Sequence, residues 1–133
     1  MVDPFELAVE LAEKARQADT FGVGGVLVDS GGAIIAKCRN QVLRNHKVYD
    51  PTGHVERQLV DWYLRQKREQ NLQLCPQELY VVTSLEPCMM CAGSMLIAGI
   101  NCVFLLEDKS AGGGFCKCCG CETLPRPLRS QAK

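Results

Sequence analysis

Residues 79–106 decide the fold of this chain, and they read LYVVTSLEPCMMCAGSMLIAGINCVFLL. Leu79 to Thr83 is rich in β-branched and apolar residues, which is typical of a buried strand. Pro87 to Ala98 predicts a helix stopped by Gly99, and Cys102 to Leu106 predicts a second strand. Strand, helix and strand make a βαβ unit, in which the two strands are parallel and the crossover is right-handed.

The stretch from Cys88 to Leu106 contains no charged residue, and it nearly reaches the roughly 20 residues that a membrane helix needs. Pro87 opens it, however, and Gly99 and Asn101 interrupt it. Its second half also has the character of a strand rather than of a helix. We therefore expect a short helix followed by a core strand, and no contact with a membrane.

The chain before residue 79 supplies two more helices and a pair of strands. A helix is predicted from Pro4 to Arg16, because Asp3 can cap it and apolar residues recur at helical spacing. Residues 24–28 and 33–36 predict antiparallel strands joined by a glycine-containing turn. The polar segment from Asn40 to Tyr49 predicts a loop. A further helix is expected from an N-cap at Thr52 to about Gln70.

The length of the chain favours one domain of ordinary size, and its charge bears on the partners to expect. Its 133 residues can bury a core without disulfides. Fifteen basic and fifteen acidic residues cancel, so the total charge gives no reason to expect a polyanionic partner, although a local basic patch remains compatible with it. The first residues lack the pattern of a secretory signal, and we expect a cytoplasmic protein.

The nine cysteines do not indicate a disulfide scaffold, because their number is odd and the chain is not very short. Cys88-x-x-Cys91 in a chain with a nearby histidine motif is more typical of metal or redox chemistry in a reducing compartment. A second group, near the C-terminus, lies in a segment with the glycines and prolines of a poorly ordered tail. We interpret its members as exposed thiols and keep a second metal site as the alternative: Cys116, Cys118, Cys119 and Cys121.

Two short motifs carry the chemistry. Cys88 and Cys91 are three residues apart, so they share one face at the start of the predicted helix, where the helix dipole favours thiolates. His54 and Glu56 lie at the start of the preceding helix. One histidine and two cysteines form the three-ligand set of a catalytic zinc site, with Glu56 beside it as a proton carrier. The spacing of the cysteines alone also fits a redox motif or a structural zinc knuckle.

His-x-Glu followed by Pro-Cys-x-x-Cys resembles the signature of the zinc-dependent cytidine deaminase superfamily. Three stretches are similar to its branch with guanine, fungal cytosine and tRNA adenosine deaminases: residues 21–28, 50–52 and 85–93. The resemblance implies an α/β fold with three layers (α-β-α) around a mixed sheet. It implies one zinc ion per chain held by His54, Cys88 and Cys91, and proton transfer by Glu56. It also implies that Asn40 contacts the substrate and that the protein is a homodimer.

The chain departs from this family at three places. Val55 stands where most relatives have alanine, and Arg57 follows the proton-carrying carboxylate; either can change the choice of substrate. The family continues into a further strand and one or two helices, whereas this chain is expected to have a truncated sheet. We expect a catalytic domain in residues 1–114 and a tail in residues 115–133.

Three functions compete at this point. The first is a hydrolytic deaminase that releases ammonia from a free nucleobase or nucleoside. The second is a deaminase of adenosine at the wobble position of a tRNA, which requires a basic surface for the phosphates. The third is a deaminase-like subunit without catalysis that keeps zinc for its fold. Intact Glu56 argues against the third, because a structural site does not need a proton carrier.

Overall fold

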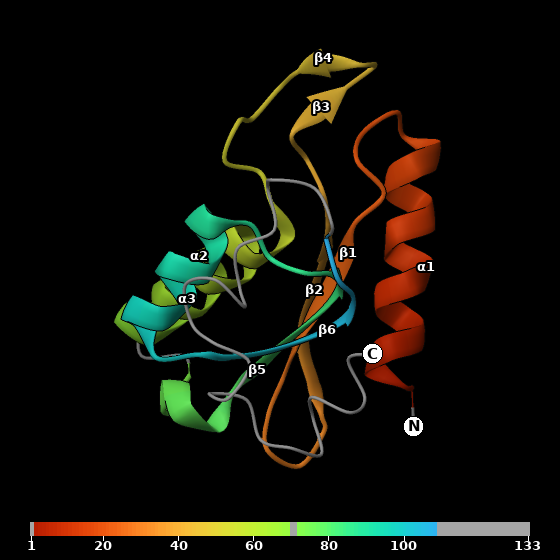
Figure 1. Ribbon diagram of the computed structural model, residues 1–133. Coiled ribbons are helices and arrows are strands. Elements are labelled where there is room, and N and C mark those ends of the chain that lie inside the picture. The colour runs from red at the N-terminus through yellow and green to blue at the C-terminus, as the bar shows by residue number, and fades with distance from the viewer. Residues whose placement is uncertain (1, 70–71, 109–133) are drawn as a thin grey trace.

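The computed structural model describes residues 2–69 and 72–108, in which three layers of secondary structure lie side by side (Figure 1). Most of the elements have the bounds that the sequence predicts within one or two residues. In chain order they are α1 (Pro4–Gln17), β1 (Gly24–Val28), β2 (Ile34–Arg39), β3 (Leu43–Arg44), β4 (Lys47–Val48), α2 (Val55–Arg68), the short 3₁₀ helix η1 (Pro76–Glu78), β5 (Tyr80–Leu85), α3 (Met89–Ala98) and β6 (Asn101–Leu106).

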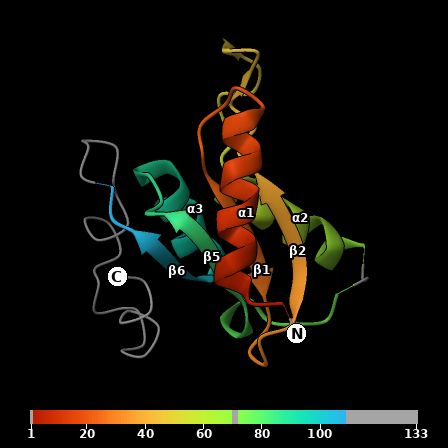
Figure 2. The ribbon, with the colours of Figure 1, turned by 90° about the vertical axis from the view of Figure 1, so that its right-hand side faces the viewer.

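Four strands form the central sheet in the order β2-β1-β5-β6. β1 is antiparallel to both β2 and β5, whereas β5 and β6 are parallel, with Tyr80 opposite Asn101 and Leu85 opposite Leu106. α1 covers one face of the sheet, and α2 and α3 cover the other (Figure 2). The predicted mixed sheet, its βαβ unit and the three-layer architecture are therefore confirmed.

The sheet separates two apolar cores, because alternate residues of a strand point to opposite faces. On the α1 side, Val26 and Val28 of β1 pack with Leu11. On the other side, Leu27 and Val81 belong to a larger cluster with residues of α2, α3 and β6. This larger core fixes α2 and α3 against each other and thereby sets the relative position of their first residues.

The start of α2 packs closely on β1 at a glycine. A Cβ atom placed on Gly25 would lie 2.3 Å from Cγ1 of Val55, which is closer than two carbon atoms can approach. Val55 is buried, with 1% of its surface exposed. The missing side chain of Gly25 therefore makes room for Val55, the residue between His54 and Glu56.

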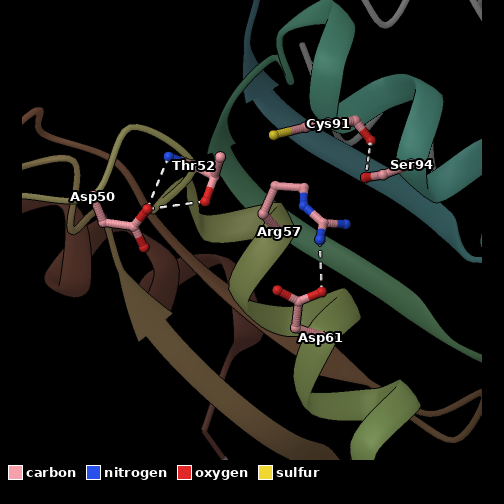
Figure 3. Close-up of polar contacts among 6 residues, drawn as sticks. All are labelled: Asp50, Thr52, Arg57, Asp61, Cys91 and Ser94. Atoms are coloured by element: carbon pink, nitrogen blue, oxygen red, sulfur yellow. Dashed lines mark hydrogen bonds and ion pairs between the residues drawn. The ribbon is translucent and has the colours of Figure 1, made fainter.

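The structure corrects the predicted start of α2. The N-cap is His54, with an extended backbone (φ −67°, ψ 150°), rather than Thr52. Thr52 belongs instead to a turn with Asp50, in which its amide and its hydroxyl both donate to Oδ1 of Asp50, at 3.0 and 2.9 Å (Figure 3). This turn at Asp50 delays the helix by two residues. α2 also ends at Arg68, slightly before the predicted end.

The structure also corrects the predicted loop at residues 40–49. β3 and β4 pair there as a small β-hairpin, which we call the β3–β4 hairpin (residues 43–48). Asn45 and His46 connect the two strands with φ values of 52° and 63°, as expected for a type I′ turn. In both views the hairpin projects from one end of the molecule, beyond the three layers (Figures 1 and 2).

The expected tail (residues 115–133) and its four cysteines lie outside the described residues. Among the helices of the described part, none has the length and the apolar character needed to cross a membrane.

Candidate metal centre and substrate cavity

His54, Cys88 and Cys91 come together although they lie on two different helices. His54 is the N-cap of α2, Cys88 is the N-cap of α3, and Cys91 is the third residue of α3. Figure 3 shows Cys91 extending from α3 toward the start of α2. The ligand atoms of the three residues all lie within 4.8 Å of one another. The two helix N-termini thus converge as the sequence predicts.

The spacing of these atoms fits a zinc ion. Nδ1 of His54 and Sγ of Cys88 are 3.6 Å apart. Zinc binds a histidine nitrogen at about 2.0–2.1 Å and a cysteine sulfur at about 2.3 Å, so two such ligands at the tetrahedral angle lie about 3.6 Å apart. One nitrogen and two sulfurs are also ligands that zinc prefers, and three protein ligands are typical of a catalytic rather than a structural site. The group is therefore positioned to bind zinc.

Cys91 lies in surroundings that disfavour a thiolate unless a cation is near. Burial raises the pKa of the Cys91 thiol far above its usual range, and the charges of Glu56 and Cys88 raise it further. A bound metal reverses this balance, because the cation stabilises the deprotonated ligand. The raised pKa of Cys91 is thus compatible with its role as a metal ligand.

Glu56 lies beside the metal-binding group in the second residue of α2, with only 3% of its surface exposed. Burial raises the pKa of its carboxyl, while hydrogen bonds from the Cys91 and Thr83 side chains and the attraction of His54 oppose this effect. A carboxyl whose pKa is raised takes up a proton more readily than an ordinary carboxyl, which suits it to act as a general acid and base.

A cavity of about 250 Å³ joins the predicted site residues. Its lining includes His54, Glu56 and Cys88, and also Asn40 at the end of β2. Asn40 is buried, and its Oδ1 accepts hydrogen bonds from Oγ1 of Thr20 (2.6 Å) and the amide of Val42 (2.9 Å). These bonds hold the amide group of Asn40 in one orientation at the cavity.

The two departures noted in the sequence lie differently in the structure. Val55 lines the cavity. Arg57 is absent from the lining, and its Nη2 donates to Oδ1 of Asp61 one turn along α2, at 2.7 Å (Figure 3). Arg57 therefore contributes to the helix surface, and we do not assign it a role in the choice of substrate.

Five lining residues are missing from the sequence-based site: Phe21, Val23, Leu85, Glu86 and Asp108. Glu86 is buried, its amide donates to the carbonyl of Leu106 (2.8 Å), and its Oε1 accepts from the amide of Asp108 (3.1 Å). These bonds tie the end of β6 to the segment before Cys88. Phe21, Val23, Leu85 and Glu86 lie within two of the stretches that resemble the family, residues 21–28 and 85–93, and this was their only signal in the sequence. Asp108 gave none.

Residues 3–107 match the family described as the cytidine and deoxycytidylate deaminase zinc-binding region. The chain belongs to this family of zinc-binding deaminases. Its relatives include the tRNA-specific adenosine deaminase of Haemophilus influenzae, which is 39% identical over 106 residues, or 79% of this chain and 57% of that enzyme.

Solved structures agree with this assignment. A tRNA:A34 deaminase studied for A-to-I editing at the wobble position has a TM-score of 0.67 and 26% identity, and the match covers 90% of this chain and 81% of that one. The guanine deaminase of Bacillus subtilis has a TM-score of 0.61 and 30% identity over 78% of this chain and 62% of its own. The chain thus has the fold of these deaminases while spanning little more than half the length of the Haemophilus enzyme.

Proposed function

We propose that the protein is a zinc-dependent hydrolytic deaminase of a nucleobase, free or within a nucleoside. The observation that carries this proposal is the placement of a buried carboxylate, Glu56, beside a His/Cys/Cys group in one cavity. A structural zinc site has four protein ligands and no need for such a carboxylate. Membership of the deaminase family supports the same reaction.

The reaction adds the oxygen of water to the ring carbon that bears the exocyclic amine, breaks the bond from that carbon to the amine, and releases ammonia. Zinc held by His54, Cys88 and Cys91 would supply the nucleophile by lowering the pKa of a water molecule. In the proposed mechanism the Glu56 carboxylate accepts the proton lost by this water. Glu56 then donates it to the neighbouring ring nitrogen. A second proton, lost by the oxygen that was added to the ring carbon, passes through the same carboxyl to the leaving amine.

Asn40 is proposed to orient the base during these steps. Its Oδ1 is occupied by Thr20 and Val42, so the amide nitrogen is the part of the group that can act as a donor toward the cavity. A donor of this kind would fix the substrate relative to Glu56, and correct orientation is itself a large part of the rate of such a reaction.

The substitution Glu56→Gln tests the catalytic proposal. It preserves the shape of the side chain and removes its ability to carry protons. We expect zinc content to remain at one ion per chain, while ammonia release falls by about 10²–10⁴-fold. The assay measures ammonia from guanine, cytosine, adenine, their nucleosides and tRNA, with metal content determined on the same samples.

Two outcomes would contradict the proposal. If the zinc-loaded parent protein releases no ammonia from any of these compounds, the interpretation as a subunit without catalysis is favoured. If Glu56→Gln releases ammonia as fast as the parent, the proton carrier is another group.

A second candidate substrate is adenosine in tRNA. Two of the three similar proteins described above are tRNA adenosine deaminases according to their names. Of the three, the Haemophilus enzyme has the highest sequence identity to this chain. Activity on tRNA with none on the free compounds would select this candidate over the first.

We also propose that the protein is a homodimer that pairs through α3. This helix carries no charged residue, and four apolar side chains on it are exposed: Met89, Met90, Leu96 and Ile97. Their spacing places them on one face, with Gly93 between the two pairs. Contiguous apolar patches of a few hundred Å² are typical of interaction sites. A two-fold contact would set this patch against itself without repulsion between like charges.

The oligomeric proposal is tested with Ile97→Lys, because Ile97 is 91% exposed and a charge there costs the free monomer little. We expect the parent to elute as a dimer and the variant as a monomer in size-exclusion chromatography with light scattering. Val9→Lys is the matched control, since Val9 is an exposed apolar residue of α1, on the other side of the sheet. A monomeric parent, or the same effect from both substitutions, would contradict the proposed interface.

The proposed cellular compartment depends on the redox state of the two cysteine ligands. Cys88 and Cys91 are free thiols, as are the other cysteines among the described residues. Zinc binding requires them reduced, so we propose that the protein works in a reducing compartment, the cytoplasm.

A further inference from the structure

The β3–β4 hairpin is built as a rigid projection rather than a slack loop. Its turn residues, Asn45 and His46, have the paired positive φ values of a type I′ turn, which matches the natural twist of two strands. The amide of His46 donates to the carbonyl of Asp19 (3.3 Å), and Nε2 of His46 lies 3.2 Å from Oδ1 of the same residue. These contacts attach the tip of the hairpin to the segment that follows α1.

The base of the hairpin is part of the cavity wall. Asn40, which lines the cavity, precedes the hairpin and accepts from the amide of Val42 at 2.9 Å. On the other side the amide of Gln41 donates to the carbonyl of Gly53 at 2.8 Å, directly before His54. A Cβ atom on Gly53 would lie 2.9 Å from the backbone of Gln41, so only glycine permits this approach. From Asn40 to the tip is at most about 16 Å, because a strand rises about 3.3 Å per residue.

The hairpin concentrates positive charge in a chain whose total charge is zero. From residue 40 to residue 49 the charged side chains are Arg44 and Lys47, with His46 as a third basic group and no carboxylate. His46 faces Asp19. Within residues 2–69 and 72–108, neither Arg44 nor Lys47 forms an ion pair with a carboxylate. Both cations are thus available to an anionic ligand beside the cavity.

Aromatic side chains accompany these charges. The guanidinium carbon of Arg44 lies 3.7 Å from the centre of the Tyr49 ring, and 55% of Tyr49 is exposed. Stacking on the ring holds the guanidinium flat and leaves its outer face and donors accessible. Phe21, which is 54% exposed, lines the cavity itself. Flat groups beside unpaired cations are the combination that binds single-stranded nucleic acid, through stacked bases and neutralised phosphates.

We propose that the β3–β4 hairpin, with Arg44, Lys47 and Tyr49, is a docking arm for the single-stranded part of an RNA whose target base enters the cavity. A free base would fill the cavity without reaching the hairpin, whereas a nucleotide beside the target base in the same strand can touch it. The inference rests on the proposed deaminase function, since it names the substrate class of that site. The arm binds the nucleotides that flank the target base, and Glu56 acts on the base itself.

The test measures binding of a short fluorescent RNA hairpin with adenosine in its loop by fluorescence anisotropy, without turnover. Arg44→Ala/Lys47→Ala is expected to weaken binding about tenfold or more at low salt. It should also make the slope of log K against log salt shallower by about 1.4, since each phosphate contact of a single strand contributes about 0.7. Tyr49→Ala should weaken binding by about tenfold, and Tyr49→Phe, which keeps the stacking face, should restore it.

The chain offers a control with the same change in charge. Arg65→Ala/Lys67→Ala removes two exposed cations near the end of α2, about 15 Å along the helix from Glu56 and outside the cavity lining. We expect this control to bind the RNA with the affinity and salt slope of the parent. Zinc content and circular dichroism verify the fold of each variant.

Three results would overturn the docking arm. They are a parent protein that does not bind the RNA, hairpin variants with the affinity of the parent, and equal losses from the hairpin and control variants. The deaminase proposal would survive any of them if ammonia release from free bases or nucleosides still depends on Glu56. If the protein releases no ammonia but binds RNA in a way that depends on the hairpin, the catalytic proposal is rejected and the docking arm is retained.

Discussion

The contact between Gly25 and Val55 gives a test of how the site is positioned. We consider Gly25→Ala, Val55→Ala and the double variant. In Gly25→Ala the new methyl group would lie 2.3 Å from Cγ1 of Val55 and 3.1 Å from the carbonyl oxygen of Val82. Overpacking of this kind costs about 1–3 kcal/mol of unfolding free energy. Displacement of α2 by the new methyl would also move His54 and Glu56, the neighbours of Val55.

Val55→Ala removes two buried methyl groups at about 0.8 kcal/mol each, and the cavity that remains raises the cost to about 2–3 kcal/mol. The double variant removes Cγ1, the atom that clashes, and the methyl group added at position 25 enters the vacated space. Additive effects would sum to about 3–6 kcal/mol, whereas we expect a loss of only about 2 kcal/mol. The coupling free energy between the two positions is thus about 1–4 kcal/mol in favour of the double variant.

Urea unfolding of the zinc-loaded proteins, followed by circular dichroism, measures these free energies, provided that the slope against urea is the same for all four proteins. Zinc content measures the position of the ligands. The Gly25→Ala variant should bind zinc more weakly than the double variant, because only the former pushes on the start of α2. Additivity within about 0.5 kcal/mol would refute the reasoning, since it would mean that the two side chains do not share this space.

Two further predictions concern Asn40 and Cys38. Asn40→Ala should destabilise the protein by about 2 kcal/mol, because it leaves the buried donors of Thr20 and Val42 without their acceptor. Asn40→Asp keeps the acceptor, so it should retain stability while raising KM. An unchanged KM would exclude the proposed substrate contact. Burial, and secondarily the charge of Glu56, raises the pKa of the Cys38 thiol to about 12. An unfolded thiol has a pKa of about 8.5, so the folded state keeps a proton that the unfolded state loses above that pH, and stability should fall as pH rises from about 8.5 toward 12. Urea titrations at several pH values should show a smaller decline for Cys38→Ala than for the parent, and equal declines would contradict the assignment.

The sequence predicts the βαβ unit well because its boundaries have local causes. Pro87 and Gly99 mark the ends of the helical region within one or two residues, and the strands on both sides consist of β-branched and apolar residues. The convergence of His54 with Cys88 and Cys91 has no such local cause, and it is predicted from the three-ligand set of a zinc site and from the resemblance to the deaminase signature. Their roles, and that of Glu56, stay predictions until metal and activity are measured.

The errors have a different origin, in competition between local partners. Thr52 is a better N-cap than histidine by preference, yet its amide and hydroxyl both bond to Asp50 and make it part of the turn that precedes the helix. The β3–β4 hairpin has strands of only two residues, too short for any alternating pattern, and its turn places His46 in a conformation that favours glycine or asparagine.

The hairpin and the cavity share their supports, and this has a consequence for substrate binding. Asn40 uses one oxygen both to hold Val42 at the base of the hairpin and to fix its own amide at the cavity. Gly53 likewise joins the hairpin to the residue before α2. Force on the hairpin from a bound strand would therefore reach Asn40 and His54 through two hydrogen bonds. Docking outside the cavity and orientation of the base inside it are then coupled. Hairpin variants should therefore change both kcat and KM on RNA. If the arm only tethered the RNA, the same variants would change KM alone.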